Sequence, residues 1–129
     1  MKIILAKSAG FCFGVNRAVT IVNNLLEEGK KVTTLGPIIH NPHMVAELAE
    51  RDVEIADTPN DLSSMDRTLV IRSHGVPQSV IDEIEQKGIS YENATCPFVS
   101  KIHQIVKDNS REGKVVLIAG DENHPEVQG

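Results

Sequence analysis

The sequence predicts an α/β fold: a parallel sheet flanked by helices on both faces, followed by the start of a second similar α/β unit. Short apolar runs alternate with amphipathic segments along the 129 residues, as repeated β-α-β units require. Aromatic residues make up only 3% of the chain and Trp is absent. The core must therefore be built from Ile, Val, Leu and Ala, which suit parallel strands that are covered on both faces.

Six strands are expected, each a short run of apolar residues between helical or polar segments. They are Lys2–Ala6, Lys31–Leu35, Val53–Ile55, Thr68–Arg72, Ser90–Asn93 and Val115–Ala119. Right-handed crossovers between parallel strands would place the intervening helices on both faces of the sheet.

Four helices are expected between these strands, at Asn16–Glu28, Asn41–Arg51, Pro77–Lys87 and Pro97–Glu112. Apolar residues recur at helical spacing in the first, third and fourth of them. In the first helix these are Val19, Val22, Leu25 and Leu26. A glycine follows each of these three helices and provides a stop signal.

The expected organisation is a first unit over residues 1–95 and the beginning of a second over residues 96–129. The boundary is expected near Cys96–Pro97, after the fifth strand. The second unit would hold one clear strand with unpaired edges, and Pro125 would occupy the first position of a helix that has barely begun. We therefore expect a truncated chain or half of something larger.

The charge and hydropathy of the chain exclude some classes of partner. Thirteen basic and 18 acidic residues give a formal charge of −5, which disfavours nucleic-acid binding. The first apolar stretch, Ile3–Ala6, is too short for a signal peptide, and no run approaches the roughly 18 residues of a membrane span. We expect a cytoplasmic protein without nucleic-acid or membrane partners, in which the two cysteines are reduced.

Five reactive side chains share one context, at the point where a predicted strand ends and a helix begins. They are Cys12, His40, His74, Cys96 and His124. The carboxyl ends of parallel strands meet at one edge of the sheet, where helix N-termini present free N–H groups and positive potential. Diphosphates and thiolates are both favoured there. This pattern indicates an anion-binding site beside a possible metal site.

Ordinary structural roles explain the same residues one at a time. A single cysteine is usually a small core residue, and glycines 10 and 14 could serve a tight turn. His43 and His103 fall within predicted helices and are interpreted as ordinary helix residues. Cys12 and Cys96 lie far apart in the sequence, so no CxxC spacing supports a zinc site. Spacing alone leaves both interpretations open.

Five motifs together are more specific. They are AGFCFGV at residues 9–15, IHN at 39–41, SHGV at 73–76, ATCP at 94–97 and HPEVQG at 124–129. In this order and spacing, they resemble the 4-hydroxy-3-methylbut-2-enyl diphosphate reductase family, also called IspH or LytB. The resemblance extends over the whole chain.

The resemblance implies three α/β units around a central cavity and an iron–sulfur cluster held by three cysteines, one from each unit. The expected cofactor is a 4Fe–4S cluster with one open iron, which binds the 4-hydroxyl of the substrate. Two electrons from a ferredoxin- or flavodoxin-type donor would remove this hydroxyl as water. The products would be isopentenyl and dimethylallyl diphosphate, as in the non-mevalonate pathway.

By the same resemblance, Cys12 and Cys96 are two cluster ligands and Glu126 is the proton-delivering carboxylate. The diphosphate-binding and pocket residues are His40, His74 and His124. The chain has only two cysteines, so the third ligand and the third unit are missing. We therefore expect a fragment of the enzyme that is inactive alone. Two alternatives are a non-catalytic phosphate-binding α/β module and a subunit completed by another chain.

Overall fold

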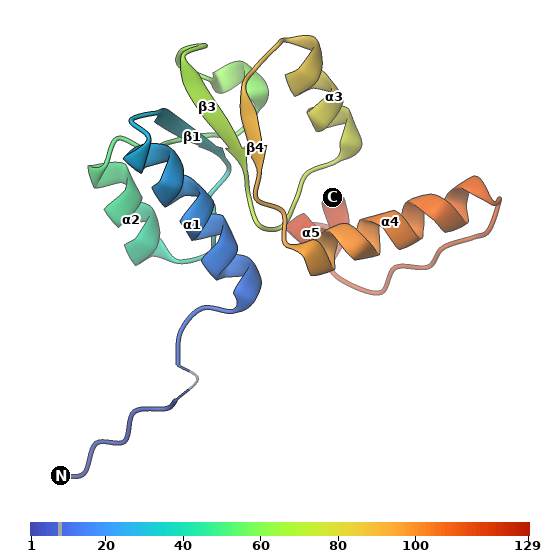
Figure 1. Ribbon diagram of the computed structural model, residues 1–129. Coiled ribbons are helices and arrows are strands. Elements are labelled where there is room, and N and C mark those ends of the chain that lie inside the picture. The colour runs from blue at the N-terminus through green and yellow to red at the C-terminus, as the bar shows by residue number, and fades with distance from the viewer. Residues whose placement is uncertain (8) are drawn as a thin grey trace.

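The computed structural model describes residues 1–7 and 9–129 and contains a four-stranded parallel sheet with strand order β2-β1-β3-β4 (Figure 1). The strands are β1 (Lys31–Leu35), β2 (Glu54–Ala56), β3 (Arg67–Ile71) and β4 (Tyr91–Asn93). The helices are α1 (Phe13–Glu27), α2 (Pro42–Glu50), α3 (Gln78–Gln86), α4 (Pro97–Arg111) and α5 (Pro125–Gln128), with a 3-10 turn η1 (Pro59–Asp61). Within the described ranges, none of these helices has both the length and the apolar character needed to cross a membrane.

Helices cover both faces of the sheet, as the sequence predicted. Successive side chains of β3 alternate between two apolar clusters, because neighbouring strand residues point to opposite faces. Val70 packs with residues of α1 and α2, including Val22 and Leu48. Leu69 and Ile71, on either side of Val70, belong to the other cluster, with residues of α3. Figure 1 shows α1 and α2 on one side of the sheet and α3 on the other.

A buried arginine fixes the start of β3 against its neighbours. The Arg67 side chain is only 5% exposed. Its Nε donates to the Thr33 hydroxyl at 2.9 Å, and one Nη donates to the Val32 carbonyl at 2.8 Å. The other Nη contacts the Asp52 carboxylate at 3.3 Å, in the turn before β2. One guanidinium therefore connects three neighbouring segments through a paired charge.

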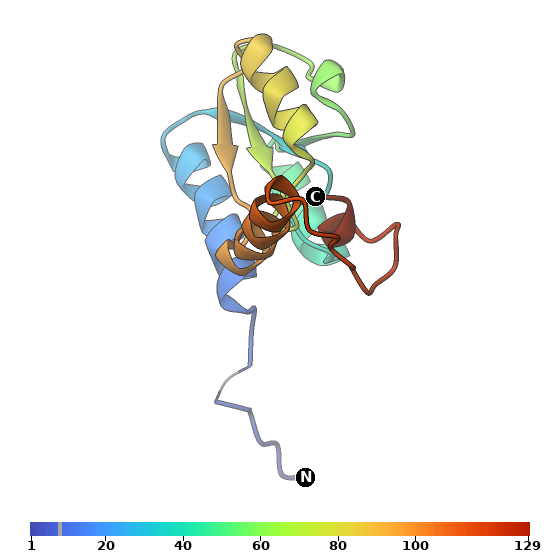
Figure 2. The same ribbon diagram turned by 90° about the vertical axis from the view of Figure 1, so that its right-hand side faces the viewer.

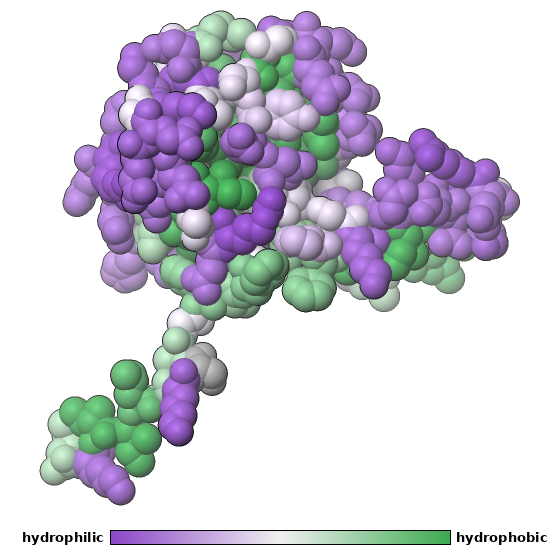
Figure 3. Space-filling view, viewed as in Figure 1, coloured by the Kyte–Doolittle hydropathy of each residue, from purple (hydrophilic) through white to green (hydrophobic). Residues whose placement is uncertain are grey.

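Two of the six predicted strands are wrong. Residues Lys2–Ala6 and Val115–Ala119 form no strand. The apolar side chains of both segments are exposed, as Leu5 at 85% and Leu117 at 91% illustrate. A strand needs a neighbour for its backbone groups, and neither segment pairs with a described strand. The first segment extends away from the sheet, where Figure 3 shows it as exposed apolar surface.

The segment expected to begin a second unit, residues 96–129, contains the helices α4 and α5 and no strand. Helix α4 begins at Pro97, as predicted, and lies beyond the end of β4 (Figure 2). It is followed by irregular chain up to α5. The apolar spacing predicts α4 correctly because a helix forms its hydrogen bonds within its own segment. A strand also needs a neighbouring strand, and the local pattern does not show whether one is present.

We predict that Arg67→Met lowers the free energy of unfolding by about 3–5 kcal/mol, because removing one member of a buried charged network leaves its partners unpaired. Urea denaturation followed by circular dichroism measures this change. Lys31→Met is the matched control, since Lys31 bonds to Asp66 on the surface at 2.7 Å. Equal losses in both variants would contradict the structural role of Arg67.

Candidate functional site

The five predicted reactive residues lie where helices begin or where strands end. Cys12, Cys96 and His124 are the N-cap residues of α1, α4 and α5. His40 and His74 lie in the segments that follow β1 and β3. A helix follows Cys12 and His124, as predicted. Among the described residues, however, no strand leads directly into either of them.

The start of α1, which follows Cys12, packs against the segment that carries Cys96. Both cysteines are free thiols; Cys12 is exposed and Cys96 is partly buried. Gly14, two residues after Cys12, lies directly against the Cys96 side chain: a methyl group on Gly14 would be 2.6 Å from the Cys96 Sγ. The first turn of α1, which Cys12 precedes, therefore lies against Cys96, and a shared role of the two thiols stays a prediction.

The histidines form a second group around His74. The ring centroids of His40 and His74 are 4.5 Å apart, and those of His74 and His124 are 6.3 Å apart. Ser73 joins the two loops, because its hydroxyl donates to the Ile38 carbonyl at 3.2 Å. The two histidines that follow β1 and β3 are thereby held side by side.

The first turn of α5 orients His124. Its Nδ1 accepts a hydrogen bond from the Glu126 backbone N–H at 3.3 Å. A neutral ring that accepts at Nδ1 carries its proton on Nε2. His124 can therefore donate from Nε2 to an anion while the helix fixes its other nitrogen.

The site lowers the pKa of His74 below its ordinary value. Burial is the largest cause, and the positive charges that His40, Arg72 and His124 can carry act in the same direction. The Glu126 carboxylate opposes them by raising the pKa. His74 therefore stays neutral over a wider pH range and can still donate one N–H, although its Nδ1 is buried without a partner in the described structure.

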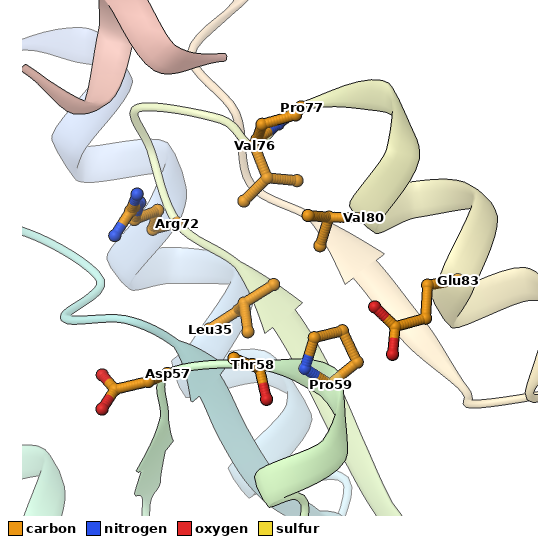
Figure 4. Close-up of a pocket in the computed structure, with 9 residues that line it drawn as sticks. All are labelled: Leu35, Asp57, Thr58, Pro59, Arg72, Val76, Pro77, Val80 and Glu83. Carbon is orange, nitrogen blue, oxygen red and sulfur yellow. The ribbon is translucent and has the colours of Figure 1, made fainter. Parts of the chain in front are cut away.

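Arg72 is a charged neighbour of the site that the sequence did not single out. Its Nη1 lies over Gly36, where a methyl group would be 2.5 Å away, and its Nε is buried without a hydrogen-bond partner among the described residues. Figure 4 shows its guanidinium pointing away from Val80 and Glu83 of α3. Arg72 follows β3 directly, so its charge lies on the edge where the histidines meet.

The small pocket in Figure 4 does not suit a diphosphate. It lies between η1, the end of β3 and α3, and its volume is only about 190 Å³. Asp57 and Glu83 contribute carboxylates to its lining, and these would repel an anion. The histidine group is the better anion site.

A larger cavity of about 700 Å³ lies between α4 and the C-terminal residues, and Glu126 is part of its lining. Glu126 is exposed, yet it is near enough to His74 to raise the pKa of that ring. The carboxylate of Glu126 therefore lies in the vicinity of His74. This volume is in the range of small-molecule sites.

His103 belongs to the surroundings of the site, although its position in a helix suggested an ordinary role. A methyl group on Gly75, the residue after His74, would be 3.0 Å from the His103 Cε1. The His103 Nε2 is buried and has no partner in the part of the chain that the structure describes. The sequence held one signal for this burial. His103 follows the buried Val99 by four residues, and residues at this spacing share a helix face.

Across residues 1–7 and 9–129, no group of three or more His, Cys, Asp or Glu side chains is arranged to hold a metal ion. The two free thiols at helix N-termini nevertheless have the donor chemistry of iron–sulfur ligands. They fit part of such a ligand set, and the remaining ligands would have to come from elsewhere.

The fold and site define a parallel α/β protein in which three imidazoles meet at the carboxyl edge of one sheet, with a cysteine at the start of the helix that follows β4. The family model described as LytB protein matches residues 3–129. The chain therefore belongs to the LytB family.

The similar proteins share one name. The chain is 50% identical over 132 residues to the 4-hydroxy-3-methylbut-2-enyl diphosphate reductase of Clostridium perfringens, covering 99% of this chain and 46% of that protein. It is 47% identical over 130 residues to the reductase of the same name from Geotalea uraniireducens, covering 100% and 45%. The chain thus spans about half the length of these curated relatives.

Two solved structures have the same fold over this region. One, described as (E)-4-hydroxy-3-methyl-but-2-enyl diphosphate reductase, matches with a TM-score of 0.83 and 44% identity over 98% of this chain and 45% of that one. The other is the Plasmodium falciparum E-1-hydroxy-2-methyl-but-2-enyl-4-diphosphate reductase, with a TM-score of 0.87 and 27% identity. It covers 94% of this chain and 38% of that one.

We predict opposite shifts in the pKa of His74 when its two charged neighbours are neutralised. Arg72→Gln removes a positive charge and should raise the pKa, whereas Glu126→Gln removes a negative charge and should lower it. NMR titration of the imidazole resonances measures both shifts. Arg111→Gln, at the far end of α4, is the control and should leave the titration unchanged. Shifts of the same sign in the first two variants would contradict this arrangement.

Proposed function

We propose that this chain supplies the N-terminal part of a 4-hydroxy-3-methylbut-2-enyl diphosphate reductase, which reductively removes the substrate hydroxyl in the non-mevalonate pathway. The proposal is supported by membership of the LytB family and by two contacts of Cys96: its side chain lies against Gly14 of α1, and its N–H donates to the carbonyl of Ser73, the residue before His74. The relatives that bear this activity in their names are about twice as long, so the activity belongs to the complete enzyme.

Cys12 and Cys96 would each hold one iron of a 4Fe–4S cluster. Thiolate ligands suit iron–sulfur clusters, and the two cysteines are the N-cap residues of α1 and α4. When bound, the cluster would relay the two electrons of the reaction from the donor protein to the substrate. A third cysteine would come from a later unit.

The three histidines would bind the diphosphate. Imidazole N–H groups donate to phosphate oxygens, and the bonds strengthen when the ring is protonated. Burial and like-charged neighbours lower the pKa of His74, and a bound anion would reverse part of that effect. The ligand would therefore increase the positive charge of its own site as it binds.

Glu126 would deliver a proton at the end of the substrate that carries the hydroxyl. The balanced reaction breaks one carbon–oxygen bond, consumes two electrons and two protons, and releases water. A ferredoxin- or flavodoxin-type protein would supply the electrons. Glu126 lines the larger cavity on α5, two residues from His124. A carboxyl group within hydrogen-bond reach of the reacting group can act as a general acid.

We also propose a cytoplasmic setting, because reducing conditions keep the two thiols available for metal binding. Residues 1–95 would form the first unit of the enzyme, and residues 96–129 would begin the second. The start of α4 at Pro97, directly after Cys96, supports this division.

We predict that substitutions in the two parts of the site separate binding from turnover. In the complete holoenzyme, His40→Ala should weaken diphosphate binding roughly ten- to a hundredfold, the cost of a charge-assisted hydrogen bond. Glu126→Gln should lower kcat with a smaller effect on affinity, because it removes the acid and keeps the shape. Steady-state kinetics and calorimetry measure both.

His43→Ala and Glu122→Gln, at exposed positions near the respective residues, are the controls for this comparison and should change neither quantity. Unchanged turnover in Glu126→Gln would reject the proton-delivery role. Unchanged affinity in His40→Ala would reject the binding role.

We predict that the 129-residue chain yields no product by itself, because its two thiolates cannot complete a three-cysteine ligand set. The chain is reconstituted anaerobically with iron and sulfide, reduced, and assayed for isopentenyl and dimethylallyl diphosphate. The complete enzyme is the positive control, and its visible charge-transfer absorption should be lost in Cys12→Ser.

Product formation by the chain alone at the rate of the complete enzyme would contradict the argument from ligand number. A complete enzyme without any visible absorption would favour the phosphate-binding module instead. Activity that appears only when a second, different chain is added would favour a subunit completed in trans.

A further inference from the structure

The side chain of Arg17 connects α1 to the segment that carries Cys96. One guanidinium nitrogen donates to the Thr95 carbonyl and another to the Asn93 carbonyl, each at 3.2 Å. The Thr95 carbonyl belongs to the peptide bond that precedes Cys96. A planar guanidinium that bonds two carbonyls limits both the distance and the direction between these elements.

Gly14 sets the closest approach at the same contact. A methyl group at this position would be 2.6 Å from the Cys96 Sγ and 3.0 Å from the Cys96 Cβ. Gly14 is helical and has no positive φ, so its backbone conformation does not require glycine. Helices favour alanine over glycine, which makes the space for the Cys96 sulfur the physical reason for this residue.

Other hydrogen bonds fix the Cys96 side of the contact. The Cys96 N–H donates to the Ser73 carbonyl at 2.8 Å, and the Thr95 N–H donates to the Asn93 side chain at 2.9 Å. These hydrogen bonds hold the segment in place without any contribution from α1. On the other side, the Cys12 carbonyl accepts from the Asn16 N–H at 2.9 Å and starts the helix.

We propose that Arg17 and Gly14 are positioning residues that set the separation of the Cys12 and Cys96 thiols. Arg17 holds the first turns of α1 against the end of β4, and Gly14 admits the Cys96 sulfur into the contact. Neither residue binds the metal. The identity of the bound group rests on the proposed function, whereas the separation of the thiols can be measured without any metal.

The test compares thiol bridging with single-thiol alkylation in the complete, metal-free protein. Dibromobimane bridges two thiols only when they are close together, whereas monobromobimane reports the reactivity of each thiol alone. In Gly14→Ala and Arg17→Gln, bridging should be severalfold slower and alkylation unchanged. Arg17→Lys keeps the charge but loses the two-carbonyl geometry, and it should resemble Arg17→Gln. The control variants are Asn24→Ala on α1 and Arg51→Lys after α2.

The same variants are then reconstituted with iron and sulfide, and their iron content, reduction potential and electron paramagnetic resonance spectra are recorded. We expect less bound iron and a changed spectrum in the variants that bridge slowly. Thermal unfolding identifies any variant that fails to fold. If Gly14→Ala does not fold, Arg17→Lys still tests the proposal.

Folded variants with unchanged bridging and an unchanged spectrum would overturn the positioning role. A wild-type protein that bridges rapidly yet binds no iron would instead reject the proposed function, with the positioning role intact. The two failures are therefore distinguishable.

Discussion

The packing of the first turn of α1 against the end of β4 is the contact on which the whole site depends. Arg17 and Gly14 form it, and it places the helix that begins at Cys12 beside the loop that ends at Cys96. The sheet supplies the rest of the geometry, because its parallel strands end at one edge. A pair of thiols from distant parts of the sequence can only serve one metal group if this contact is rigid.

Local charge explains how an acidic protein could bind the anionic substrate that we propose. The chain carries a formal charge of −5, so its overall field opposes a diphosphate. The edge of the sheet compensates with the Arg72 guanidinium, helix N-termini and three imidazoles that can donate hydrogen bonds. His74 lies at the centre of this group, where each neighbour changes its pKa. The site is therefore prepared for an anion without a permanent cluster of positive charge.

The sequence predicted the elements that depend on local patterns and missed those that depend on distant partners. The four strands of the sheet and helices α1 to α4 were readable from apolar periodicity and glycine stops. The segments 2–6 and 115–119 have the same apolar pattern but no neighbour to pair with, so periodicity could not separate them from true strands. Arg17 and Arg72 were missed because ordinary helix or strand-end arginines have no sequence signal that reveals which carbonyls or rings they will approach.

The central claim is that Cys12 and Cys96 bind one and the same metal cluster at the carboxyl edge of the sheet. A crystal structure of the anaerobically purified, complete holoenzyme, with anomalous diffraction recorded at the iron edge, tests it most directly. We predict a single group of iron peaks with bonds to the Sγ atoms of both cysteines, adjacent to His74. Iron peaks bound to only one of the two sulfurs, or located away from this edge, would contradict the account.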